Sequence, residues 1–180
     1  MVMNILLEFI VRLLLYLIIF IVPILINLKY REKVSIPEFL MLKGNSKKGI
    51  QIGIIVSFIY VFLLIIKGSI NDFENVNLHI GIMWLSAIIV GLIEEIPFRG
   101  FLLHKLDIKF GFIKANLLTT VIFVLLHFPQ WLFSGGNIFL NSFQIGVVSF
   151  VFGYLVKEYK SLWPSIICHS VFNCCFWIGL

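Results

Sequence analysis

The sequence predicts an all-α protein, a polytopic bundle of about six transmembrane helices. Two properties of the composition indicate this fold class: 61% of the 180 residues are hydrophobic and only 13% are charged. Soluble domains typically have about 45–50% apolar and about 25% charged residues. The third observation is that the apolar residues form six long runs with short polar segments between them. No polar segment is long enough to fold separately, so residues 1–180 are expected to form a single integral-membrane domain.

Each apolar run is long enough to cross the hydrocarbon layer of a membrane, which requires about 20 helical residues. Polar or turn-forming segments mark the breaks between the runs: the Lys- and Glu-rich stretch 29–48, KGSINDFENVN, HKLDIKFGFIK, SGGN and KEYKS. We expect a helix in each run and a loop at each break. The predicted spans are 5–27, 49–66, 78–103, 115–133, 139–156 and 162–180.

The lysines and arginines alternate between successive loops. The first loop carries six of them, the second one, the third three, the fourth none and the fifth two. Short cytoplasmic loops carry the excess of positive charge in membrane proteins. The first, third and fifth loops are therefore expected to be cytoplasmic, and both termini to lie outside the cytoplasm, in a multi-pass protein of the cell membrane.

The net charge of +5 does not indicate nucleic-acid binding, because the cations lie in loops rather than on one face of a soluble module. Three cysteines, Cys168, Cys174 and Cys175, lie in the last apolar run. They form neither a disulfide framework nor a paired C-x-x-C zinc pattern. We expect them to be buried free thiols.

The third run contains three ionisable residues, Glu94, Glu95 and Arg99, in the stretch LIEEIPFRG. Such residues are costly inside a bilayer and usually face the bundle interior or a hydrated cavity. A helix turns by 100° per residue, so Glu95 and Arg99 share a face and can form an ion pair, while Glu94 points elsewhere. Pro97 removes a backbone donor and clashes with the carbonyl of Ile93. It therefore either opens the helix to water beside the glutamates or simply bends it.

Polar residues also occur in two other runs: His127 in the fourth, and His169 and Asn173 in the sixth. His169 and Asn173 are four residues apart, so both side chains can project into one cavity. At 1.5 Å per residue, these residues and Glu94 lie ~10–18 Å from the cytoplasmic ends of their helices. Spans that run in opposite directions thus place their polar groups at a similar depth.

These residues are suited to hydrolysis. Glu94 is a candidate general base toward water, and His127 could help to hold and polarise the water. Asn173 and His169 are candidate hydrogen-bond donors to the oxyanion of a peptide-bond hydrolysis. Cys168 precedes His169 directly, but adjacent helical residues point ~100° apart, so a cysteine–histidine nucleophile is not expected.

The same residues could instead bind a metal. Glu94, His127 and His169 with a water molecule would make a zinc-hydrolase ligand set, and zinc would lower the pKa of the water to about 7. The H-E-x-x-H pattern, which places two ligands on one helix, does not occur. Either no cofactor or a divalent metal such as zinc is compatible with the sequence.

Three short stretches resemble the motifs of the CAAX-protease and bacteriocin-processing (Abi) family of intramembrane endopeptidases. The stretches EEIPFR, FVLLH and HSVFN match its motifs E-E-x-x-x-R, F-x-x-x-H and H-x-x-x-N in the same order. The similarity covers about residues 85–173, within an expected catalytic core at 80–180. The resemblance implies that Glu94 and His127 activate water, that His169 and Asn173 stabilise the oxyanion, and that Glu95 and Arg99 support the site.

The resemblance also implies a membrane-anchored peptide or protein as substrate, with membrane lipid as the other partner and no nucleic acid. The family is called metalloprotease by name, although a metal-free mechanism has been favoured for some members. Three alternatives stay open. The protein could sequester a peptide or confer bacteriocin self-immunity without catalysis, it could be an ion-coupled carrier, or its polar residues could simply tie helices together. A carrier is disfavoured because no second half of the chain mirrors EEIPFRG.

Overall fold

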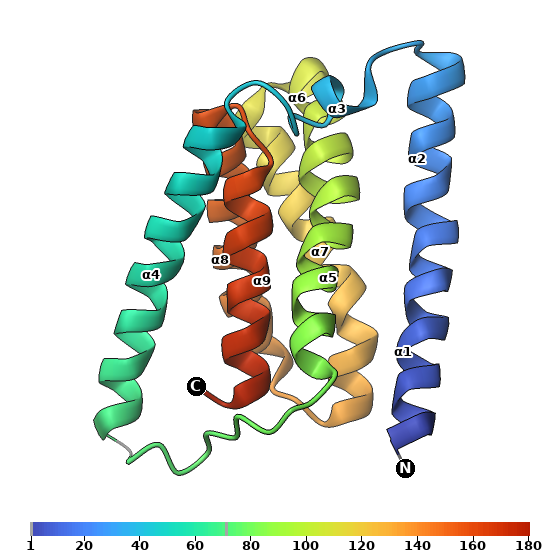
Figure 1. Ribbon diagram of the computed structural model, residues 1–180. Coiled ribbons are helices and arrows are strands. Elements are labelled where there is room, and N and C mark those ends of the chain that lie inside the picture. The colour runs from blue at the N-terminus through green and yellow to red at the C-terminus, as the bar shows by residue number, and fades with distance from the viewer. Residues whose placement is uncertain (1, 71) are drawn as a thin grey trace.

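The computed structural model describes residues 2–70 and 72–180, with the backbone alone described for residues 2–6 and 12. Every regular element in these ranges is a helix, and no strand occurs in them. The prediction of an all-α protein is therefore confirmed. The long helices run side by side, and α1 begins at the end of the bundle where α9 ends (Figure 1).

The first predicted span is part of one helical path that continues to Arg31, four residues beyond the expected end. Two π-helical stretches, η1 and η2, interrupt its α-helical geometry. The path consists of α1 (Val2–Tyr16), η1 (Leu17–Ile21), α2 (Val22–Ile26) and η2 (Asn27–Arg31).

The segment after this first helix folds back onto it. A short helix, α3 (Ile36–Phe39), places Leu40 against Ile24 and Leu28, and these three side chains form a buried apolar cluster. Burial of a leucine or isoleucine side chain stabilises a fold by about 1.5–3 kcal/mol. The cluster therefore fixes this end of the first helix, and the predicted linker 29–48 is partly helical.

The centre of the bundle is α9 (Trp163–Ile178), which packs against α4 (Ser46–Ile70), α5 (Met83–Glu95) and α8 (Ile138–Tyr159) (Figure 1). Gly91 allows the closest approach between α5 and α9. A Cβ atom at Gly91 would lie 2.7 Å from the backbone nitrogen of Ser170. The two helices thus pack backbone to backbone, as is common where small residues line a membrane-helix interface.

The third predicted span, 78–103, begins later and ends later than expected. The helix begins at Met83 and continues as η3 (Ile96–Leu103) and α6 (His104–Phe110). The loop predicted in HKLDIKFGFIK is wrong for residues 104–110 and 112–114, which are helical. The helix ends only at Gly111, whose φ of +77° is favourable for glycine and breaks the α conformation.

Pro97 is the second residue of the π-helical stretch η3, two positions after Glu95. Proline has no N–H group and its ring clashes with the preceding turn, so α-helical hydrogen bonding fails at this point. The predicted departure from α geometry beside the glutamates is therefore present. A π-helical turn rotates the residues after it relative to those before it, and such turns are frequent at functional sites.

The fourth and fifth predicted spans form a hairpin of α7 (Phe112–Ser134) and α8, joined near Gly135. Asn137 caps α8 by accepting a hydrogen bond from the backbone N–H of Leu140, at 3.0 Å. Gly153 lies directly against the side chain of Asn116, so the small residue permits the close approach of α8 to α7.

Four helical segments among the described residues are long and apolar enough to cross a membrane: residues 7–31, α4, α7 and α8. The other two predicted spans are not among these four segments, because one is too short and the other carries several charged residues. The helix α9 has only 16 residues, and the path from α5 through η3 carries Glu94, Glu95 and Arg99. The number of six spans and the orientation of the termini remain predictions.

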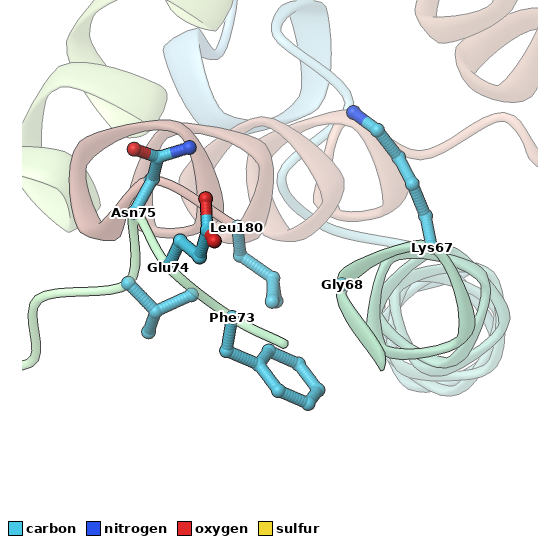
Figure 2. A pocket seen from close by; sticks show the side chains of 8 residues that line it. Lys67, Gly68, Phe73, Glu74, Asn75 and Leu180 are labelled. Atoms are coloured by element: carbon cyan, nitrogen blue, oxygen red, sulfur yellow. The ribbon is translucent and has the colours of Figure 1, made fainter. Parts of the chain in front are cut away.

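The connection from α4 to α5 runs along the end of the bundle where α9 ends (Figure 1). The backbone N–H of Asn77 donates a hydrogen bond to the carbonyl of Ile178 at 2.9 Å, which ties this connection to α9. Figure 2 shows the cavity of about 110 Å³ beside this contact, where Phe73, Glu74 and Leu180 face the end of α4. None of the candidate site residues is among the described residues that line it.

Candidate active site

The predicted ion pair between Glu95 and Arg99 is present in the bundle interior. The Nη1 atom of Arg99 donates to Oε1 of Glu95 at 2.7 Å, and the exposed fractions of the two side chains are 1% and 0%. Buried charges need both a partner and further hydrogen bonds to offset the cost of leaving water. Other contacts of these two residues supply some of those bonds, although Oε2 of Glu95 and Nε of Arg99 are buried without a hydrogen-bond partner in the described chain.

Arg99 is held by α7 and α8 as well as by Glu95. Its Nη2 atom donates to the hydroxyl of Ser149 at 2.8 Å and to the Ser149 carbonyl at 3.2 Å. The guanidinium carbon lies 4.5 Å from the ring centroid of Phe123 and 5.7 Å from that of Phe152, within the range of cation–π attraction. One arginine therefore joins η3 to α7 and α8.

Glu95 also binds His169, which joins α5 to α9. The Nδ1 atom of His169 lies 2.8 Å from Oε1 of Glu95, the oxygen that Arg99 contacts. A carboxylate paired with an arginine accepts hydrogen bonds, so Nδ1 of His169 carries the proton and donates. The other ring nitrogen, Nε2, is then directed away from Glu95 and is the atom available for chemistry.

Glu94 occupies a different environment from Glu95, as the helical geometry predicts. Its Oε2 atom lies 3.7 Å from Nε2 of His169, beyond hydrogen-bond distance, and this oxygen is buried without a hydrogen-bond partner in the described part of the chain. The side chain is 18% exposed and lines a cavity of about 220 Å³. Glu94 therefore borders a space that can hold several water molecules, and one of its carboxylate oxygens has no hydrogen-bond partner in the described chain.

His127 lines the same cavity as Glu94. Its Nδ1 atom lies 2.8 Å from the carbonyl oxygen of Phe123, one turn earlier in α7. A carbonyl can only accept, so Nδ1 carries the proton, and in the neutral ring Nε2 has a free lone pair. The backbone of α7 thus selects the tautomer of His127.

Asn173 and His169 line a second cavity of about 30 Å³, together with His127. The amide nitrogen of Asn173 is buried and has no hydrogen-bond partner among residues 2–70 and 72–180. The prediction that His169 and Asn173 project into one cavity is therefore confirmed. His127 and Phe123 line both cavities, so the two spaces adjoin.

The described residues do not fit a metal site. Within them, no group of three or more His, Cys, Asp or Glu side chains is arranged so that it could hold a metal ion. Glu94 and His169 lie 3.7 Å apart, but His127 does not complete a set of three with them. The predicted zinc ligand set is therefore not assembled.

The three cysteines are free, as expected, although Cys174 is only half-buried. Cys168 Sγ lies 3.7 Å from the hydroxyl of Ser57 and 3.6 Å from the carbonyl of Gly53, both in α4. The thiol of Cys168 therefore contacts α4.

Sequence reasoning missed two residues at the site. Ser149 is a small residue in an apolar run, and its contact with Arg99 depends on how α8 is rotated in the bundle. Tyr16 of α1 lines the cavity of Glu94 and His127, yet a tyrosine in an apolar span has no distinguishing pattern. Only the packing of the first helix against η3 reveals it.

A family model described as type II CAAX prenyl endopeptidase Rce1-like matches residues 76–175, more than half of the chain. The chain belongs to this Rce1-like family. The match agrees with the motif resemblance to CAAX proteases and supports an intramembrane endopeptidase activity in general terms. No curated protein and no solved structure matches the chain.

The Rce1-like region contains α5, η3, α6, α7, α8 and most of α9. All the candidate residues from Glu94 to Asn173 therefore lie within it. The first helix and α4 precede it, so Tyr16 belongs to a part of the chain that the family match does not reach.

Proposed function

We propose that this Rce1-like protein hydrolyses a peptide bond of a membrane-anchored protein or peptide with water that Glu94 activates. One observation carries the proposal: Glu94, whose buried Oε2 has no hydrogen-bond partner in the described chain, and His127 line one cavity inside an apolar bundle. A hydrolase needs a base within reach of a bound water molecule.

In this mechanism Glu94 removes one proton from water while Nε2 of His127 accepts a hydrogen bond from the other O–H of that water molecule. The oxygen then attacks the carbonyl carbon of the scissile bond and a tetrahedral oxyanion forms. Glu94 passes its proton to the amide nitrogen, and the C–N bond breaks to give a carboxylic acid and an amine. Since the cavity is surrounded by apolar helices, charge that develops there interacts strongly with nearby dipoles.

The oxyanion is stabilised by donors on α9. The amide of Asn173 faces the second cavity without another partner, which leaves its N–H groups free for this role. His169 donates from Nε2 when that atom is protonated. A protonated His169 with Arg99 would balance the charges of Glu94 and Glu95, an arrangement that a low-dielectric interior favours.

Glu95 and Arg99 act on this chemistry indirectly. Glu95 orients the ring of His169 through Nδ1, and Arg99 keeps Glu95 charged and fixed. This relay resembles the general arrangement in which a buried carboxylate selects the tautomer of a catalytic histidine. The proposed mechanism needs no metal, in keeping with the lack of a three-ligand group among the described side chains.

The test measures cleavage by the full-length protein, purified in detergent and returned to lipid nanodiscs. The probes are internally quenched peptides that end in a C-a-a-X sequence, each with and without a prenyl group on the cysteine. Wild type is compared with Glu94→Gln and His127→Ala. Glu158→Gln, a change of an exposed carboxylate at the end of α8, is the matched control.

We expect the control to cleave like wild type. Glu94→Gln and His127→Ala should lose activity by at least about 10²-fold, the lower range for removal of a general base, while melting temperatures stay near that of wild type. Full activity of Glu94→Gln would refute the general base. Tight binding of the peptides by wild type without any cleavage would instead favour a binding or immunity protein.

We also propose that the protein crosses the cell membrane six times with both termini outside the cytoplasm. The lysine- and arginine-rich loops at one end of the bundle, and the two chain ends at the other, support this topology (Figure 1). To test this topology, a single cysteine is introduced at one of two exposed loop positions, Asn45 or Asn137. Intact cells are then treated with a membrane-impermeant maleimide. Labelling of position 137 but not of position 45 is expected, and the reverse pattern would refute the orientation.

A further inference from the structure

We propose that the hydroxyl of Tyr16 binds the water molecule that Glu94 activates, an inference that rests on the proposed function. Tyr16 is the last residue of α1 and lines the cavity of about 220 Å³ together with Glu94 and His127. Since the family match begins at residue 76, this assignment concerns a helix to which the match gives no role.

Two of the residues that line this cavity each have a buried polar atom without a hydrogen-bond partner in the described chain. The hydroxyl oxygen of Tyr16 and Oε2 of Glu94 are both buried, and neither has a hydrogen-bond partner within the described ranges. A buried hydroxyl without a hydrogen bond costs about 1–3 kcal/mol, so tyrosines in such positions nearly always bind protein or water. Two such groups at one polar, roomy cavity are best satisfied by a shared water molecule.

The local structure fixes the tyrosine in this position. The ring of Tyr16 lies 4.6 Å, centroid to centroid, from the ring of Phe20, one turn later, and Phe20 lines the same cavity. The π-helical stretch η1 begins directly after Tyr16 and contacts η3, the stretch that follows Glu95. The two departures from α geometry therefore meet beside the cavity, and the first helix presents a hydroxyl there rather than an aliphatic side chain.

The three side chains suit one water molecule. Neutral His127 offers a lone pair at Nε2, and ionised Glu94 offers carboxylate oxygens, so both accept from the water. The phenol can donate to the water oxygen and so complete its hydrogen bonds. The hydroxyl of Tyr16 thus orients the water oxygen and leaves one of its lone pairs free to attack the carbonyl carbon. The proton of the phenol is not transferred in the reaction.

The test compares Tyr16→Phe with wild type in lipid nanodiscs, with the prenylated C-a-a-X peptide as probe. Tyr16→Phe keeps the ring against Phe20 and removes only the hydroxyl. We expect kcat to fall about tenfold, as for the loss of one hydrogen bond, with KM changed by less than about twofold. Tyr154→Phe, an exposed tyrosine of α8, is the matched control and should cleave like wild type.

A double-mutant cycle separates a shared water molecule from a packing effect. In Glu94→Gln, the further change Tyr16→Phe should shift the melting temperature by clearly less than it does in wild type. This measurement needs no substrate. Additive shifts would overturn the inference, as would full activity of Tyr16→Phe beside an inactive Glu94→Gln. Full activity of Glu94→Gln would instead overturn the proposed function.

Discussion

Glu95 uses one oxygen, Oε1, to accept a hydrogen bond from Nδ1 of His169 at 2.8 Å, although the two residues are 74 positions apart. The same oxygen accepts from Arg99 at 2.7 Å. A single buried carboxylate therefore connects α5 to α9 and sets the tautomer of a candidate catalytic histidine. Its removal should affect both the fold and the activity.

Glu95→Ala should destabilise the protein by about 3–5 kcal/mol, because it leaves the charge of Arg99 buried and unpaired. The activity should also fall, since His169 loses its orienting partner. Thermal unfolding in detergent measures the first effect. Lys157→Ala breaks a half-exposed ion pair with Asp107 and should cost less than about 1 kcal/mol. Equal losses in the two variants would show that the buried pair contributes no more than the surface pair.

Asn173→Ala should reduce kcat by about 10²–10³-fold, as for removal of one oxyanion donor, while the melting temperature stays close to that of wild type. Stability is spared because the amide nitrogen of Asn173 has no partner in the described chain. Asn116→Ala is the opposite case, since its side chain donates to the carbonyl of Phe150 at 2.9 Å. It should lower stability more than activity. Unchanged kcat in Asn173→Ala would remove this residue from the mechanism.

Gly91→Ala should destabilise the protein by about 1–3 kcal/mol, because its methyl group would overlap the backbone of Ser170 and separate α5 from α9. The same change at Gly146 is the control. A Cβ there meets only Val124 Cγ2, at 3.8 Å, and alanine favours the helix by up to about 1 kcal/mol. Thermal unfolding of both variants checks the contrast, which fails if Gly91→Ala is as stable as Gly146→Ala.

Treatment with a zinc chelator should leave the cleavage rate unchanged, because no three-ligand group is assembled among the described side chains. Elemental analysis of the purified protein provides the independent measurement. Loss of activity on chelation, recovery with zinc, and one zinc per chain in wild type but not in His127→Ala would together replace the metal-free mechanism with a metal-dependent one.

Much of the candidate site could be predicted from spacing within single helices. The pairing of Glu95 with Arg99 follows from a separation of four residues, and so does the shared direction of His169 and Asn173. The departure from α geometry after Glu94 follows from Pro97. The extent of that departure does not, because the helix continues through η3 and α6 to Phe110 where a loop was expected. Charged residues are compatible with a helix as well as with a loop, and the ending at Gly111 depends on its backbone conformation.

The sequence by itself determined that the chain is an all-helical membrane protein, and it determined which polar residues share a face of one helix. Both follow from local properties, namely apolar length and helical periodicity. The tertiary structure alone decided which atoms meet between helices: His169 with Glu95, Ser149 with Arg99, and Tyr16 with the cavity of Glu94. Such contacts depend on how each helix is rotated and tilted against its neighbours, which is set by the packing of many side chains and not by any one stretch of sequence.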